Sequence, residues 1–203
     1  LTGIIKEKHP GLPVYIFAHS FGSFLGQDYI ERYGNEIAGI ILSGSAARKG
    51  PEINLGMTIA AIQRAFLGER RKSRLIHAMA FGSYNGRIKN PKSRFSWLTR
   101  DEETVKKYED DPFCGTVFTI GFYYYMFKGL LRLYRKEKLD NVPRELPVLI
   151  LSGEEDPVGD YGKSVETLFK IYERLGLKNL GIKLYPGGRH EMHNETNKDE
   201  VFK

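Results

Sequence analysis

Three side chains in this sequence have the types that nucleophilic catalysis requires: a serine, an aspartate and a histidine, in that order. Ser20 lies near the beginning, whereas Asp156 and His190 lie in the last third. A serine hydroxyl is a poor nucleophile at neutral pH and needs a histidine base that is oriented by a carboxylate. Such a set performs acyl transfer, in which the serine oxygen attacks a carbonyl carbon.

The segment around Ser20 predicts a sharp turn between a strand and a helix. Residues 14–18 have strand-forming character, and residues 21–33 follow with a helix-like pattern. A turn of this kind exposes a nucleophilic serine at the end of a strand. Ala18 and Gly22 are small, as expected if the strand and helix backbones pass close to the serine at both positions.

The other two candidates also follow strand-like segments. Asp156 comes after the apolar run 147–152, and His190 comes after the run 180–185. In open α/β sheets, ligands bind outside the carboxyl ends of the strands. The chain order serine, aspartate, histidine is that of α/β hydrolases and differs from that of the two well-known protease folds.

The pattern of elements predicts an α/β fold. Residues 14–18, 21–33 and 37–43 indicate strand, helix and strand, and residues 147–203 repeat this alternation with a helix at about 161–175. Such alternation implies a parallel sheet with covering helices. We expect the helix over 21–33 to bury its large apolar residues, which are Phe21, Phe24, Leu25, Tyr29 and Tyr33.

Two domains are expected. Residues 1–47 and 147–203 form the α/β core, and residues 48–146 contain no strand-like run and form a helical cap or lid. One aromatic stripe in this insertion serves either core packing or substrate contact; it comprises Phe118, Phe122, Tyr125, Met126, Leu130 and Leu133.

Composition limits the class of protein. The longest uncharged run, 112–127, is too short to span a bilayer, and a single cysteine, Cys114, permits no internal disulfide and fits a reducing compartment. We therefore expect a cytoplasmic protein. The basic excess lies in residues 48–146. It indicates either a solvated face, the simpler interpretation, or peripheral contact with an anionic membrane surface. No nucleic-acid-binding motif accompanies it, and the sequence does not indicate an oligomeric state.

Three segments carry a family resemblance. They are His19-Ser20-Phe21-Gly22-Ser23, Gly153–Val158 and Tyr185–Glu195, and the last is the most specific. With them the chain resembles the monoacylglycerol lipase and lysophospholipase group of α/β hydrolases, which is related to serine aminopeptidases. Residues 97–101 and 111–114 are similar to lid segments of bacterial members.

The resemblance implies an ester hydrolase with a helical lid that acts on monoacylglycerols or lysophospholipids without metal or organic cofactor. Ser20 would be the nucleophile, His190 the base and Asp156 its orienting acid, and the backbone N–H of Phe21 would stabilise the oxyanion. Peptidase, thioesterase and acyltransferase activities remain alternatives within the same chemistry.

The chain departs from the family pattern in two ways. Ala18 replaces a glycine, a small steric change that we expect to be tolerated. The His-Gly loop that supplies a second oxyanion donor is absent, and we expect it, with the first strands of the domain, upstream of residue 1. A non-catalytic fragment therefore remains an alternative to an active enzyme.

Other residues compete for the same roles. The acid could also be Glu154, Glu155 or Asp160. We expect the two glutamates to be exposed to solvent and Asp160 to cap the helix that follows. For the base, we expect His193 to form a structural pair with Glu195 and His19 to be a satisfied buried histidine. For the remaining histidines, His9 and His77, no sequence pattern indicates a catalytic role.

Overall fold

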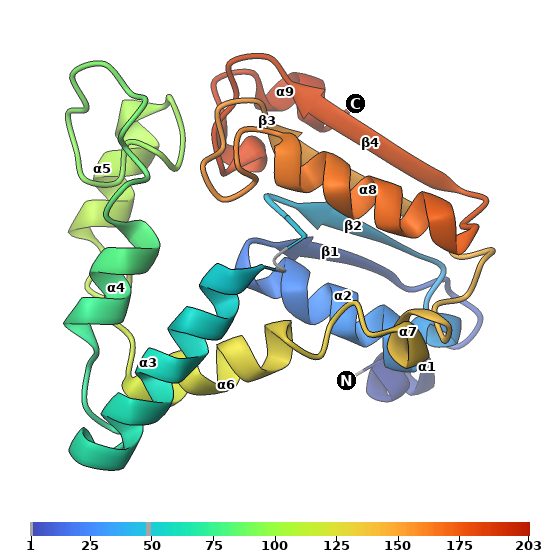
Figure 1. The fold of residues 1–203 in the computed structure, drawn as a ribbon. Helices are drawn as coiled ribbons and strands as arrows, with labels where there is room; N and C mark the ends of the chain where they lie inside the picture. The colour runs from blue at the N-terminus through green and yellow to red at the C-terminus, as the bar shows by residue number, and fades with distance from the viewer. Residues whose placement is uncertain (1, 48–49) are drawn as a thin grey trace. The chain divides into compact units, whose positions relative to one another are not determined.

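The computed structural model describes residues 2–47 and 50–203 and divides the chain into two compact units (Figure 1). The core unit comprises residues 1–47 and 135–203, and the helical unit comprises residues 48–134. Within the described ranges, no helix is long and apolar enough to cross a membrane. The two units are described separately below.

A four-stranded parallel sheet forms the centre of the core unit, with the strands in the order β1-β2-β3-β4. The strands are β1 (Tyr15–His19), β2 (Gly39–Ser43), β3 (Val148–Gly153) and β4 (Leu180–Tyr185). The register places Ala18 beside Leu42 and Leu42 beside Ile150. The predicted α/β class is confirmed, because the continuous apolar runs pair as parallel strands do.

Two helices, α2 (Phe21–Tyr33) and α8 (Lys163–Leu175), cover the same face of this sheet (Figure 1). The buried residues of α8 recur at helical spacing; they are Val165, Leu168 and Tyr172. The helix ends at Gly176, whose φ of +86° is the left-handed conformation that a helix C-terminus commonly uses.

The face that α2 buries differs from the expected one. The buried residues are Ser23, Gly26, Gln27, Ile30 and Glu31, whereas Leu25 and Tyr33 are 56% and 54% exposed. A Cβ on Gly26 would lie 3.0 Å from the Cβ of Ala18. At Gly26 the helix therefore packs so close to β1 that a larger residue would not fit, and Leu25 and Tyr33 lie outside this buried face.

Short elements complete the core unit. They are α1 (Thr2–Lys8), η1 (Gly34–Glu36), α7 (Lys136–Leu139), η2 (Met192–Asn194) and α9 (Lys198–Val201). Helix α1 ends at Lys8, two residues before Pro10. Met192 of η2 is fully buried against Leu151 and Tyr185, which anchors the segment after β4 to the sheet.

The helical unit contains α3 (Pro51–Leu67), α4 (Arg74–Phe81), α5 (Glu102–Asp110) and α6 (Ile120–Leu130). Helices α3 and α6 pack side by side, and a Cβ on Gly56 of α3 would lie 2.5 Å from the ring of Phe127. Of the expected aromatic stripe, Leu130 and Leu133 are buried, whereas Tyr125 is 54% exposed and does not serve core packing. The other apolar side chains that α6 buries are Ile120, Tyr123 and Phe127.

Candidate active site

Ser20 occupies the turn between β1 and α2 in a strained backbone conformation, with φ 55° and ψ −124°. Positive φ is costly for a residue with a side chain, and such strain persists only where the surroundings hold it. Here the N–H of Ser20 donates to the carbonyl of Ser43 at 3.0 Å. The carbonyl of Ser20 accepts from the N–H and the hydroxyl of Ser23, at 2.8 and 2.6 Å. These bonds hold the backbone of Ser20 in its strained conformation.

The crowding expected on both sides of Ser20 is present on one side only. Ala18 lies against Gly26, as described above. A Cβ on Gly22, in contrast, would meet no atom of the described residues within 4 Å. The small residue required by close packing is therefore Ala18, and its methyl group fits against a glycine of the facing helix.

Asp156 lies fully buried in the loop that follows β3. Its carboxylate accepts hydrogen bonds from the N–H of Val158 at 2.8 Å and from the hydroxyl of Ser152 at 3.2 Å. Burial alone would raise the pKa of this carboxyl, but the attraction and hydrogen bond of His190, with these two donors, hold the pKa below its usual value. Asp156 is therefore ionised at neutral pH.

The loops that carry Asp156 and His190 are joined backbone to backbone. The N–H of Glu155 donates to the carbonyl of Gly188 at 2.8 Å. A Cβ on Gly153, at the end of β3, would lie 2.0 Å from that same carbonyl oxygen, so only glycine permits this approach. The buried carboxylate of Glu195 accepts from the N–H of Arg189, directly before His190. This network fixes the histidine loop over the end of β3.

The structure brings Ser20, His190 and Asp156 into one hydrogen-bonded line. The Nδ1 atom of His190 lies 3.0 and 3.1 Å from the two carboxylate oxygens of Asp156, and its Nε2 lies 2.8 Å from the Oγ of Ser20. An ionised carboxylate only accepts, so Nδ1 carries the proton and Nε2 accepts from the serine hydroxyl. Phe21, the first residue of α2, follows Ser20 directly and presents its N–H at a helix N-terminus.

The arrangement agrees with a comparison to protein families. A family profile described as "Serine aminopeptidase, S33" matches residues 1–197. The chain belongs to the serine aminopeptidase S33 family. A monoacylglycerol lipase from Mycolicibacterium smegmatis is 24% identical over all 203 residues, and the chain spans 64% of the length of that lipase.

Solved structures support the same fold. The chain is similar to a carboxyl esterase from Bacillus coagulans, crystallised with glycerol, with 28% identity and a TM-score of 0.89 over 99% of this chain and 65% of the esterase. It is also similar to a monoglyceride lipase variant from Saccharomyces cerevisiae, with 21% identity and a TM-score of 0.67 over 99% of this chain and 66% of the lipase. The core unit therefore has the α/β-hydrolase fold.

The competing acids differ from the buried Asp156 in their exposure to solvent in this S33 family member. Glu154, Glu155 and Asp160 are exposed, and the backbone N–H groups of the two glutamates, not their carboxylates, make the bonds that join the loops. Helix α8 is capped by Gly162, so Asp160 does not have the expected capping position.

The expected pair between His193 and Glu195 is not formed at Nδ1, which has no hydrogen-bond partner among the described residues. The Glu195 carboxylate instead binds the N–H groups of Arg189 and Thr196. The Nδ1 atom of His19 lies 3.3 Å from the hydroxyl oxygen of Ser43. Burial above all lowers the pKa of His19 to about 3, so this histidine is uncharged at neutral pH.

Sequence reasoning missed two serines that support the site, Ser152 against Asp156 and Ser43 against His19. Each is a fully buried polar residue at or near the end of an otherwise apolar strand, and that position is the signal that could have identified them. Within residues 2–47 and 50–203, no group of three or more metal-ligating side chains is arranged to hold an ion.

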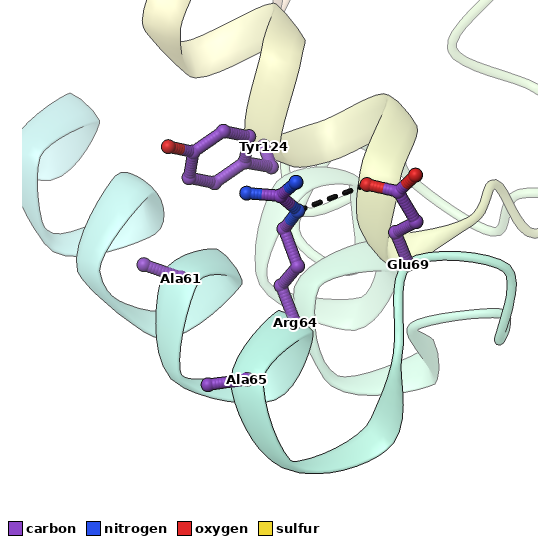
Figure 2. A pocket seen from close by; sticks show the side chains of 5 residues that line it. All are labelled: Ala61, Arg64, Ala65, Glu69 and Tyr124. Carbon is purple, nitrogen blue, oxygen red and sulfur yellow. Dashed lines mark hydrogen bonds and ion pairs between the residues drawn. The ribbon is translucent and has the colours of Figure 1, made fainter.

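A depression on the helical unit is lined by residues of that unit alone (Figure 2). Arg64 of α3 pairs with Glu69 at 2.9 Å, and its guanidinium lies 4.7 Å from the centre of the Tyr124 ring. The positive charge in this depression is therefore already neutralised by a carboxylate and an aromatic face. Its remaining lining residues, Ala61 and Ala65, add only methyl groups.

Proposed function

We propose that the protein containing this chain is a carboxylic ester hydrolase in which Ser20 is the nucleophile. The observation that carries the proposal is the line of hydrogen bonds from Ser20 Oγ to His190 Nε2, at 2.8 Å, and from His190 Nδ1 to Asp156, at 3.0 Å. A nucleophile, a base and an orienting acid within such reach are what acyl transfer requires.

The reaction would proceed in two stages. Ser20 Oγ attacks the ester carbonyl carbon while His190 Nε2 takes the hydroxyl proton, and the resulting imidazolium is stabilised by the buried Asp156 carboxylate. His190 then gives this proton to the departing alcohol, which leaves an acyl-serine. Water, deprotonated by the same imidazole, releases the carboxylic acid and restores Ser20.

Negative charge develops on the carbonyl oxygen in both stages. The Phe21 N–H, at the N-terminus of α2, is the donor we assign to this oxyanion. A backbone donor costs no reorganisation during the reaction, because the helix already fixes its direction. Loss of one such donor costs about 3–4 kcal/mol in comparable sites.

The test is labelling with a fluorophosphonate, which reacts only with an activated serine, followed by peptide mapping. We expect one adduct, on Ser20, and we expect Ser20→Ala to abolish both labelling and ester hydrolysis with an unchanged fold. Ser83→Ala, which changes an exposed serine of the helical unit, is the matched control. Ester turnover by Ser20→Ala at the wild-type rate would refute the assignment.

We propose that the substrate is a single-chain lipid, such as a monoacylglycerol or a lysophospholipid, and that the helical unit serves as a lid. Two similar proteins are named monoacylglycerol or monoglyceride lipases, and a third was crystallised with glycerol. A panel of monoacylglycerol, lysophospholipid, thioester and aminoacyl-amide substrates would decide between lipase, thioesterase and peptidase activity. Hydrolysis of only the amide would contradict the proposal.

Peripheral contact with anionic membranes is supported by a stripe of exposed apolar side chains on α3, separate from the face that α3 buries. Leu55, Ile62 and Phe66 share one side of this helix and are 55%, 54% and 83% exposed. The residues that α3 buries lie elsewhere on its circumference; they are Ile53, Gly56 and Ala60. Four exposed basic residues follow the helix within residues 70–74. Apolar side chains beside basic ones suit an anionic bilayer surface.

Sedimentation with vesicles would test this contact. We expect binding to vesicles that contain phosphatidylglycerol and little binding to pure phosphatidylcholine. Phe66→Ser should weaken the binding about tenfold, the value for one buried aromatic side chain. Phe113→Ser is the matched control, because Phe113 is 91% exposed but lies outside α3. Equal weakening by both variants would exclude α3 as the contact.

A further inference from the structure

Four aromatic rings stand in a row beside the nucleophile. The order is Phe17, His193, His19, His190, with ring centres separated by 5.8, 4.6 and 4.9 Å. Phe17 and His19 alternate along β1 and so share a face of the strand. His193 lies in η2, and His190 lies in the loop before it. This ring row joins the strand that carries Ser20 to the loop that carries the base.

His19 is fixed within the row by β2. Its register partner is Ser43, which is buried and whose hydroxyl lies 3.3 Å from His19 Nδ1. The next residue, Gly44, closes the space beside two of the rings. A Cβ at Gly44 would lie 3.0 Å from His19 Cε1 and 2.9 Å from His190 Cε1. The two imidazoles are therefore enclosed together.

The bonds from the His190 ring to Asp156 and Ser20 do not by themselves restrain every motion of the ring. Its bonds to Asp156 and Ser20 are made by Nδ1 and Nε2, and both lie in the plane of the ring. In-plane bonds do not resist tilting of the ring about the axis that joins the two nitrogens. A second ring packed against the imidazole, tilted by 48°, does resist it, and His19 supplies that ring.

We propose that His19 is a positioning residue that holds the His190 imidazole at the tilt in which both hydrogen bonds form, with His193 and Phe17 packed behind it. The proposal rests on the function proposed above and assigns to that site a residue that acts through the base.

The charges around His19 suit this role. Burial, and then the like charges of His190 and His193, lower its pKa, whereas Asp156 and Ser43 raise it; the result is a pKa of about 3. Next to His19 in the row, burial lowers the pKa of His193, and Glu191 opposes that change. His19 therefore stays uncharged when His190 takes the proton of Ser20, so no like charge opposes the imidazolium.

The test compares two substitutions by the rate of Ser20 phosphonylation. His19→Phe keeps an uncharged ring, and we expect a rate within about threefold of wild type, with the same pH of half-maximal labelling. His19→Ala removes the ring, and we expect a loss of about tenfold or more, since misplacement of a catalytic group by 1 Å can cost about a hundredfold. His9→Ala, an exposed histidine outside the row, is the control.

Two results would overturn the proposal. Wild-type labelling by His19→Ala would show that the ring is not needed. Equal losses in both variants would show that the imidazole nitrogens matter and that packing does not. If His19→Ala fails to fold, Ser43→Ala tests the same restraint, because it removes only the hydroxyl beside His19 Nδ1, and a rate equal to wild type would then count against the proposal.

Nuclear magnetic resonance separates this inference from the enzymatic one. The Nδ1 proton of His190, held against Asp156, should give a downfield signal that persists in His19→Phe and broadens or disappears in His19→Ala. If the signal depends on the residue at position 19 in this way, but the wild-type protein does not react with the fluorophosphonate, the proposed function fails and the positioning contact stands. If the signal is the same in all variants, the positioning role fails.

Discussion

Substitution of Gly44 by alanine would place a methyl group between the two imidazoles beside Ser20. The new Cβ would lie 2.9 Å from His190 Cε1 and 3.0 Å from His19 Cε1. Carbon atoms prefer separations of about 3.5–4.0 Å, so His190 must move by roughly 0.6 Å or more. The φ of +55° at this position adds about 1–2 kcal/mol of backbone strain to any residue with a side chain.

Gly176→Ala is the matched control for that strain. Its φ is +86°, at the end of α8, and a Cβ there would meet no described atom within 4 Å. Gly176→Ala should lose about 1–2 kcal/mol in free energy of urea unfolding from strain alone, and Gly44→Ala should lose about 1–3 kcal/mol more, because its methyl group also overpacks the two rings. Only Gly44→Ala should also slow Ser20 phosphonylation, by about tenfold, because only it displaces the base. Equal labelling rates in the two variants would refute the reasoning.

Three further predictions concern the same site. Between pH 6.5 and about 3, the unfolded chain binds a proton at His19 that the folded chain does not. The free energy of urea unfolding should therefore decrease on acidification, by up to about 1.4 kcal/mol per pH unit. In His19→Phe this decrease should be less steep. Glu195→Ala should cost about 2–3 kcal/mol in the same assay, because the N–H groups of Arg189 and Thr196 lose their acceptor, whereas Glu195→Gln, which keeps an amide oxygen, should cost less. Asp156→Asn should lower kcat for ester hydrolysis by about 10⁴, because an amide can present N–H groups to His190 and favour the wrong tautomer; a decrease of less than tenfold would contradict the orienting role.

The strands and their parallel arrangement were predictable from the sequence, because buried parallel strands appear as short continuous apolar runs. The same pattern placed Ser20, Asp156 and His190 at strand ends, where a parallel sheet must bring them to one edge. The faces of the helices were not predictable in this way. Helical periodicity selects the aromatic residues of α2, such as Tyr33, but the face that α2 buries is the one on which Gly26 approaches Ala18, and Tyr33 is 54% exposed.

The supporting residues of the site depend on tertiary placement, which no local pattern contains. The ring of His19 packs on His190 only because residues 171 positions apart in the chain meet at the sheet edge. Likewise, Glu195 could be recognised as a buried carboxylate only after its loop was placed over β3. The order of the strands in the sheet, by contrast, equals their order in the chain, so each new strand can add to the edge formed by the one before it.

That sequential order has a consequence for biosynthesis. The ribosome makes Ser20 170 residues before His190, an interval of about 10–30 s at ordinary elongation rates. During that time β1, α2 and β2 can form the nucleophile turn, but no base can accept the serine proton. Under the mechanism proposed above, the nascent chain therefore carries a shaped but unreactive serine. This serine would not be acylated by esters until β4 has docked and the histidine loop has closed over the end of β3.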